Sequence, residues 1–232
     1  MTKSATGRET SVTVAYKRIL NKIIKGELLP GSPLREVHIA REFDLSPTPV
    51  REAMRCLEHD GWLQSIPFRG RVVRRFTKED VVGCFLLREG IECVAVRLFI
   101  ENAPREIWDE MHREVAAEEA FPADCTEEER GLFREMDLHF HELLFCGSGV
   151  SALTELYARI RAQLQLLYRG KALVTVAEVV REHRMILEAL EDRLTPVAEG
   201  LVRHHIQVAL MRTLSRESLI RPPRRRRNTS KK

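Results

Sequence analysis

The sequence has no apolar run long enough to cross a membrane. Nowhere in its 232 residues does a stretch approach the roughly 18 to 20 consecutive apolar side chains of a spanning helix. Met1 to Thr13 also lacks the apolar centre of a signal peptide. Together these two absences lead us to expect a cytosolic protein with no membrane partner.

Cysteine is scarce, and its spacing argues against two further classes of protein. The chain has five cysteines, an odd number, and no Cys-x-x-Cys pair. This pattern disfavours a disulfide framework and a zinc knuckle, and we expect reduced thiols that fill the cores. The cysteines are Cys56, Cys84, Cys93, Cys125 and Cys146.

Charge is unevenly distributed along the chain, although the net charge at pH 7 is only +4. Residues 1–76 carry 14 basic against 8 acidic side chains, residues 77–220 carry 17 against 26, and residues 221–232 carry 7 against none. The basic first block predicts a domain that contacts a polyanion, and the acidic block predicts one that does not. The last block reads as a disordered basic tail, which could attract DNA nonspecifically or only increase solubility.

The basic block has the pattern of a winged helix-turn-helix. Apolar side chains recur at helical spacing over Ser11 to Lys25, over Leu34 to Phe43 and from Ser46 to about Asp60. The glycines and the proline of "GELLPG" separate the first two helices, and Ser46 is a suitable N-cap for the third. After Gly61, "WLQSI" and "RVVRR" around "PFRG" predict a small β-hairpin.

The third helix of this block carries side chains that could read DNA. Arg51 and Arg55 lie one turn apart, opposite the apolar stripe, so the helix can enter a major groove while the arginine-rich hairpin contacts phosphate or the minor groove. A solvated basic face is the alternative for two such arginines. The helix order, the short turn and the basic hairpin together favour DNA.

The acidic block predicts an all-α antiparallel bundle of about six helices. "TKED", at Thr77 to Asp80, is a capping pattern ahead of a long helix, and no stretch after the hairpin has the pattern of a strand. We therefore expect a mainly α chain with a DNA-binding domain at 1–76, an all-α domain at 77–220 and the tail at 221–232. Further helices are expected at about 104–120, 126–145, 150–168, 175–191 and 195–215.

An aspartate and two histidines interrupt the apolar stripe of "MDLHFHELLF". Asp137 and His141 stand four residues apart on one helical face, while His139 points elsewhere. Such a pair alone could bind a metal, or it could form a hydrogen bond at the edge of a core. The choice between these interpretations depends on ligands from elsewhere in the chain.

Two later histidines could supply those ligands. His183 and His205 each lie beside the apolar stripe of a helix, so they can converge with Asp137 and His141 on zinc, nickel, manganese or iron. Spacing alone leaves the metal site undecided. His204 competes with His205, and either could be a surface residue.

Several motifs resemble a known family. "KGELLPGSPL", "IAREFDLSPTPVREAMRCLEHDGWL" and "PFRGRVV" resemble the winged-helix domain of GntR-type bacterial transcription regulators. "LLREGIECVAVRL", "DLHFHELL", "EHRMILEAL" and "HHI" resemble the FadR C-terminal domain of one large subfamily. The resemblance implies a homodimeric repressor or activator that binds an inverted-repeat operator in double-stranded DNA.

Particular DNA contacts follow from the resemblance. Pro47 stands where the family usually has an arginine, so one donor is missing and the operator sequence is undetermined. The implied DNA-binding residues are Arg35, Ser46, Thr48, Arg51, Arg69 and Gly70.

The resemblance also implies a ligand site. A divalent metal, zinc or nickel first and manganese or iron as alternatives, would be held by Asp137, His141, His183 and His205. Arg88, in "REGIE", stands where the family has an arginine facing the pocket. With an open metal position it would bind the carboxylate of a small organic acid, the effector.

Three alternatives compete with this interpretation. Arg88 could instead form a surface salt bridge with Glu92, four residues later. The protein could sense the metal itself, without an organic effector. It could also be a metal-dependent hydrolase with Glu142 or Glu182 as its base, but a winged helix on a hydrolase would be unexplained.

Overall fold

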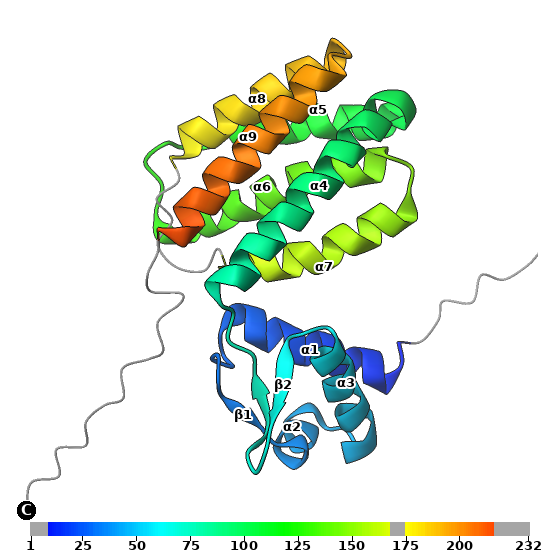
Figure 1. Ribbon diagram of the computed structural model, residues 1–232, viewed down its shortest axis with the longest axis vertical. Coiled ribbons are helices and arrows are strands. Elements are labelled where there is room, and N and C mark those ends of the chain that lie inside the picture. Colours follow the sequence, from blue (N-terminus) through cyan, green and yellow to red (C-terminus); the bar gives the residue numbers. More distant parts are fainter. Residues whose placement is uncertain (1–8, 168–174, 216–232) are drawn as a thin grey trace, which may run out of the picture. The chain divides into compact units, whose positions relative to one another are not determined.

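The computed structural model describes residues 9–167 and 175–215, which belong to two compact units that divide between Phe76 and Thr77. Helices dominate both units, and within the described ranges strands occur only in the first (Figure 1). This confirms the mainly α class predicted from the sequence. No described helix is both long and apolar enough to span a membrane. The basic tail at 221–232 lies outside the described residues.

Three helices form the core of the first unit: α1 (Ser11–Lys25), α2 (Glu36–Phe43) and α3 (Pro47–His59). α1 and α3 pack against each other, and each contributes fully buried apolar side chains, such as Ile19 and Met54. α1 ends at Gly26, whose φ of 69° gives the left-handed cap that glycine adopts without strain. The three-helix arrangement predicted from the apolar periodicity is confirmed.

A small antiparallel sheet completes the first unit in the order β1, β3, β2. Its strands are β1 (Pro33–Leu34), β2 (Leu63–Ile66) and β3 (Gly70–Val73). β2 and β3 form the predicted hairpin, and Phe68 and Gly70 at its tip have positive φ. This hairpin is the wing of a winged helix-turn-helix.

One local expectation for the first unit is wrong and another is confirmed. Leu34 was expected in the second helix, but it pairs with the wing as part of β1, and α2 begins only at Glu36. A two-residue strand is too short to leave a detectable period in the sequence. The expected N-cap of α3 is confirmed: Ser46 occupies that position and the helix starts at Pro47 with its preset φ, although the Ser46 hydroxyl makes no capping hydrogen bond.

The cysteines only partly match the expectation of core-filling thiols. All five are free, and Cys84, Cys93 and Cys125 are buried. Cys56 and Cys146 are exposed, which contradicts the expectation. They lie on the solvent side of α3 and of the helix Glu127–Gly147, where the core does not reach.

Six helices build the second unit, and no strand occurs among its described residues. The first helix of this unit packs against its last helix and also against its third and fourth helices (Figure 1). The predicted all-α bundle is confirmed. The helices are α4 (Lys78–Asn102), α5 (Arg105–Glu119), α6 (Glu127–Gly147), α7 (Ser151–Leu167), α8 (Val176–Glu191) and α9 (Thr195–Leu214).

Local signals in the sequence fix the positions of α4 and α6. Thr77 and Asp80 form a reciprocal capping box at the start of α4, as "TKED" predicted. Near the end of α6, Gly147 lets that helix approach α4 closely, since a Cβ there would overlap the ring of Phe99. α4 and α6 are in contact, and both helices carry polar side chains described next.

Candidate metal centre and nucleic-acid interface

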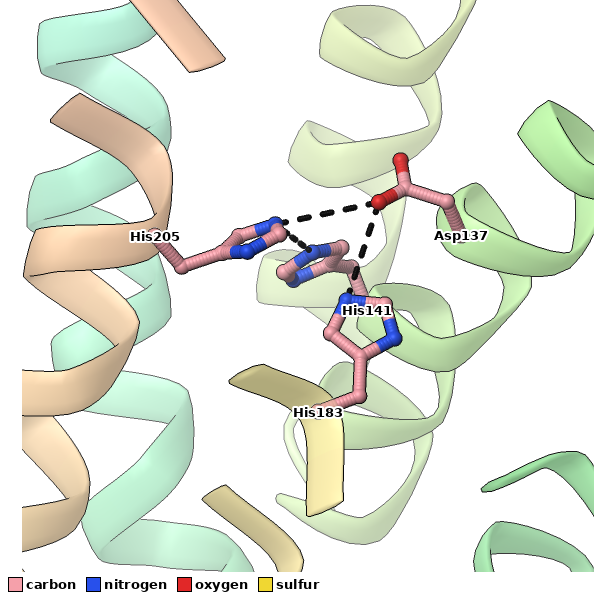
Figure 2. Close-up of side chains that lie close together, drawn as sticks. All are labelled: Asp137, His141, His183 and His205. Atoms are coloured by element: carbon pink, nitrogen blue, oxygen red, sulfur yellow. Dashed lines mark hydrogen bonds and ion pairs between the residues drawn. The ribbon is translucent and has the colours of Figure 1, made fainter. Parts of the chain in front are cut away.

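Four side chains singled out from the sequence lie together inside the second unit (Figure 2). Asp137 and His141 project from α6, His183 from α8 and His205 from α9. One donor atom of each lies within 4.8 Å of the donor atoms of the other three. The three histidine side chains are at most 3% exposed. Helix packing therefore gathers residues from three helices of the bundle at one point in the core.

The histidine nitrogens that face this point are the Nε2 atoms. Those of His141 and His205 are 3.1 Å apart. The Asp137 Oδ1 atom lies 3.6 Å from His183 Nε2 and 3.7 Å from His205 Nε2. Donors that each lie about 2 Å from one ion are themselves separated by roughly 3 to 3.5 Å in tetrahedral or octahedral coordination. The observed separations are close to that range.

Each of the three histidines turns its other ring nitrogen, Nδ1, toward a glutamate. The contact of His141 is with α4, that of His183 with α5, and that of His205 with α8. A carboxylate in this position can accept a hydrogen bond from Nδ1–H and so orient the ring of a histidine that binds a metal. The Nδ1–Oε2 distances are 2.7 Å for His141 and Glu92, 2.8 Å for His183 and Glu118, and 2.6 Å for His205 and Glu182. The contacts of His183 and His205 are hydrogen bonds, whereas His141 Nδ1 and Glu92 Oε2 are close together without forming one.

The unpartnered nitrogens test whether these residues suit a metal. His183 Nε2 is buried and has no hydrogen-bond partner among the described residues. A buried acceptor left unsatisfied costs about 1–3 kcal/mol. The Nε2 atoms of His141 and His205, which face each other, need either a proton or a cation between their lone pairs. One cation would satisfy all three nitrogens, so the residues present fit a divalent metal.

Burial and nearby charges set the protonation of the histidines. Burial, with the positive charge of Arg88, holds the pKa of His141 well below its ordinary value, and burial lowers the pKa of His205. Burial also acts to lower the pKa of His183, but the charge and hydrogen bond of Glu118 outweigh it and raise the pKa overall. His141 and His205 are therefore held in the neutral form, which is the form that binds metals.

Arg88 is buried and paired with Glu92. Its Nε atom lies 2.6 Å from Glu92 Oε1, and both side chains are 0% exposed. The salt bridge considered from the sequence therefore exists, but its expected surface position is wrong. Since Glu92 Oε2 contacts His141, this glutamate links Arg88 to the histidine centre. Burial raises the pKa of Glu92 to about 7, against the opposing charge of Arg88.

The two remaining histidine alternatives are decided by their positions. His139, on α6 beside the centre, turns instead to α5, where its Nδ1 lies 2.7 Å from Glu114 Oε2. His204 is exposed on α9, whereas its neighbour His205 is buried. Geometry thus favours His205 over His204 and keeps His139 outside the cluster. Of the surrounding glutamates, Glu118 was not singled out from the sequence, because nothing in its local spacing relates it to α8.

The expected DNA contacts lie on exposed positions of the first unit. They occur in three places: the N-cap of α2, the start of α3, and the tip of the hairpin. These residues are thus exposed at or near the ends of helices and strands, where side chains and backbone amides can contact phosphate. The exposed residues are Arg35, Ser46, Thr48, Arg51, Arg69 and Gly70.

Glu36 of α2 joins the third helix to the wing. Its Oε2 accepts a hydrogen bond from Arg51 Nε at 2.9 Å, and its Oε1 accepts one from Arg71 Nη1 at 3.0 Å. Arg71 also donates from Nε to Glu58 of α3 at 3.0 Å. Arg51 uses Nε for this contact, and not the terminal pair of nitrogens that the side chain offers to a guanine. Sequence reasoning missed Glu36, which contacts partners 15 and 35 residues away.

Comparisons with known proteins match both units. Residues 12–73 match the bacterial regulatory proteins of the gntR family, and residues 84–208 match the FCD domain. A probable D-xylose utilization operon transcriptional repressor of Paenarthrobacter nicotinovorans is 28% identical over 211 residues, which cover 89% of this chain and 91% of the relative. The HTH-type transcriptional repressor RspR of Escherichia coli (strain K12) is 26% identical over 198 residues, which cover 83% and 84%.

Solved structures share the fold. E. coli McbR/YncC superposes with a TM-score of 0.69 at 19% identity and covers 90% of this chain and 99% of its own. A putative transcriptional regulator GntR from Rhodococcus sp. RHA1 also reaches a TM-score of 0.69, at 23% identity, with 88% and 98% covered. At these identities the likeness is one of fold alone.

Proposed function

We propose that this chain, which belongs to the gntR family of bacterial regulatory proteins and carries an FCD domain, is a regulator controlled by a metal-bound organic acid. Members of the family bind operator DNA and typically act as dimers. Family membership makes the chain a DNA-binding transcription regulator, not an enzyme, which removes the hydrolase alternative. The finer proposal is carried by the convergence of one aspartate and three histidines in the FCD domain.

The division of labour follows the two units. Residues 1–76 bind one half of an inverted-repeat operator, residues 77–220 bind metal and effector, and residues 221–232 add a basic tail. Support comes from the boundary between the compact units at Phe76 and Thr77, and from the opposite net charges of the first two parts. A homodimer would supply the second DNA-binding unit that an inverted repeat requires.

The metal ligands in this proposal are Asp137, His141, His183 and His205. Three imidazoles and one carboxylate suit zinc or nickel, with manganese or iron as alternatives. The short Nε2 contact and the unpartnered His183 nitrogen support a cation at this point. A bound ion would supply a positive charge and an open coordination position for an oxygen of the effector.

Arg88 provides the second contact to the effector. A guanidinium and a cation together recognise a carboxylate, which makes a small organic acid the expected ligand class. Such an acid competes with Glu92 for Arg88, and Glu92 also faces His141. A ligand changes DNA binding only if it binds two conformations of the regulator unequally, and the pairing of Glu92 is a contact that the acid would alter.

A sensor of the metal alone is the second candidate. It is favoured by the burial of Arg88 and Glu92, since the guanidinium is already paired with a buried carboxylate. In that case the metal would control DNA affinity without an organic ligand.

One titration series distinguishes the two candidates. Elemental analysis of the purified full chain first establishes whether a metal is bound. Operator affinity is then measured with the metal alone, with candidate organic acids alone and with both. A response to an acid only in the presence of metal supports the proposed function, and a full response to metal alone supports the sensor. A protein that binds no metal, with equal thermal stability in chelator, would contradict both.

A further inference from the structure

Three glutamates around the histidine centre are not among the proposed metal ligands. Glu92, Glu118 and Glu182 come from α4, α5 and α8, and each contacts the Nδ1 atom of a different histidine. The glutamate and its histidine are on different helices in every pair. The same contact therefore arises three times from unrelated parts of the bundle, which argues for a common purpose.

The chemistry of imidazole shows what such a contact does. A neutral histidine carries one proton, on Nδ1 or on Nε2, and only the nitrogen without it has a lone pair for a metal. An ionised carboxylate can only accept a hydrogen bond. The hydrogen bonds of Glu118 and Glu182, at 2.8 and 2.6 Å, therefore stabilise the Nδ1 proton of His183 and His205 and leave Nε2, the atom that faces the centre, as the donor to a metal.

The burial of these carboxylates makes a purely structural role costly. The side chains of Glu92 and Glu118 are 0% exposed, and that of Glu182 is 16% exposed. Transfer of a carboxylate into a core is unfavourable unless it is paired and hydrogen-bonded, and an apolar side chain of similar size often gives equal or greater stability. Fixing the histidine tautomer is a function that no apolar residue could replace.

His183 shows most clearly that the ligands are positioned without a metal. Glu118 holds its Nδ1 at 2.8 Å, and the ring of Phe140 stacks on it with the centroids 3.9 Å apart and the planes 8° apart. The ring is thus restrained in its plane and about its axis. Its Nε2 is buried, aimed at the centre, and without a hydrogen-bond partner among the described residues.

We propose that Glu118 and Glu182 are positioning residues that fix the Nδ1–H tautomer of His183 and His205 and direct their Nε2 lone pairs at one metal ion, while Glu92 contacts the third histidine, His141. This inference rests on the proposed metal site, but it concerns residues that the site itself does not require. Loss of such an orienting carboxylate weakens metal affinity by about 10- to 100-fold in known metal sites.

A matched pair of variants tests the role of Glu118. Glu119, the next residue of α5, contacts Arg184, the next residue after His183 on α8, through bonds of 2.7 and 2.6 Å. Glu118→Gln and Glu119→Gln therefore make the same chemical change at adjacent residues of α5, and each alters one contact with α8. Zinc affinity is measured by competition with a chromophoric chelator. We expect about a 10- to 100-fold loss in Glu118→Gln and wild-type affinity in Glu119→Gln. Equal affinities would overturn the inference.

A second pair covers the case in which Glu118→Gln does not fold. Glu182 on α8 contacts His205 on α9, and Glu178, one turn earlier, contacts Arg212 on α9 at 2.6 Å. Glu182→Gln should weaken zinc binding, and its control Glu178→Gln should not. Helical content from circular dichroism confirms that each variant compared is folded. Undiminished zinc affinity in folded Glu182→Gln would contradict the positioning role.

The tautomer can also be measured directly in metal-free wild-type protein. Nitrogen-15 NMR of labelled histidine distinguishes Nδ1–H from Nε2–H, and we expect Nδ1–H for His183. At a pH at which the ring is neutral, an Nε2–H signal would overturn the inference whatever the metal measurements show. Wild-type protein that binds no zinc would instead refute the proposed function, and the NMR result would still decide the role of Glu118.

Discussion

Arg51→Ala is the most informative test of the DNA-reading surface. The side chain is 56% exposed, and its contact with Glu36 is an exposed ion pair of the kind that contributes about 0–1 kcal/mol to folding. The substitution should therefore leave the fold and the dimer intact. Any large loss of operator affinity then reports on DNA contact and not on stability.

The expected loss follows from the number of contacts. One bidentate contact between arginine and guanine discriminates by about 1–3 kcal/mol. A homodimer on an inverted repeat makes the contact twice, so the total is roughly 2–6 kcal/mol, or about 30-fold to about 20,000-fold in affinity. Glu36 strengthens this expectation, because it holds Arg51 through Nε and so orients the terminal nitrogens without using them.

Fluorescence anisotropy with operator and scrambled duplexes at several salt concentrations measures the effect. Arg55→Ala is the matched control, since Arg55 lies one turn further along α3, is 65% exposed and pairs with Glu52 at 3.2 Å. We expect Arg51→Ala to lose preference for the operator and Arg55→Ala to keep it. An equal loss of operator preference in both variants would refute base reading by Arg51. So would an equal loss of affinity for operator and scrambled DNA in Arg51→Ala, with a salt slope lower by about one.

Three further predictions concern the second unit and the tail. Saturation with metal at about 100 times its Kd should add about 2.7 kcal/mol to the free energy of unfolding, a rise of roughly 5–11 °C in Tm by calorimetry. Chelator should reverse this rise in Tm in wild type and in His139→Ala. His183→Ala should show no rise in Tm with metal. Arg88→Lys should keep its metal by elemental analysis and lose the response of operator affinity to acids, because lysine lacks the planar fork. Removal of residues 221–232 should weaken binding to operator and scrambled DNA alike, visible as a shallower salt dependence; a changed sequence preference would contradict this.

The sequence predicted those parts of the fold that are written in local patterns. Apolar periodicity and caps located the helices, as Thr77 and Asp80 show for α4. The same logic put Asp137 and His141 on one face, because residues four apart on a helix are neighbours. β1 was missed, since the pairing of Leu34 with the wing depends on a strand far along the chain.

Contacts between helices could not be predicted in the same way. Glu118 and Glu119 are adjacent and chemically identical, yet one is buried against His183 and the other exposed against Arg184. Which of them turns inward depends on the rotation of α5 against α8, a property of the packed bundle. The choice between His204 and His205 has the same origin, in the rotation of α9.

The position of Glu92 suggests how ligand binding can reach the DNA-binding unit. Its two carboxylate oxygens have different partners, Arg88 at 2.6 Å and His141 at 2.7 Å. In the proposed function, an organic acid that took Arg88 would leave Glu92 with the histidine alone, whereas a metal bound by His141 would strengthen the second contact. Both events would change the contacts of the same residue of α4, the helix whose first residue, Lys78, is separated from the first unit by Thr77 alone. Allosteric coupling needs an element that two ligands bias between different arrangements, and α4 is the helix on which both would act.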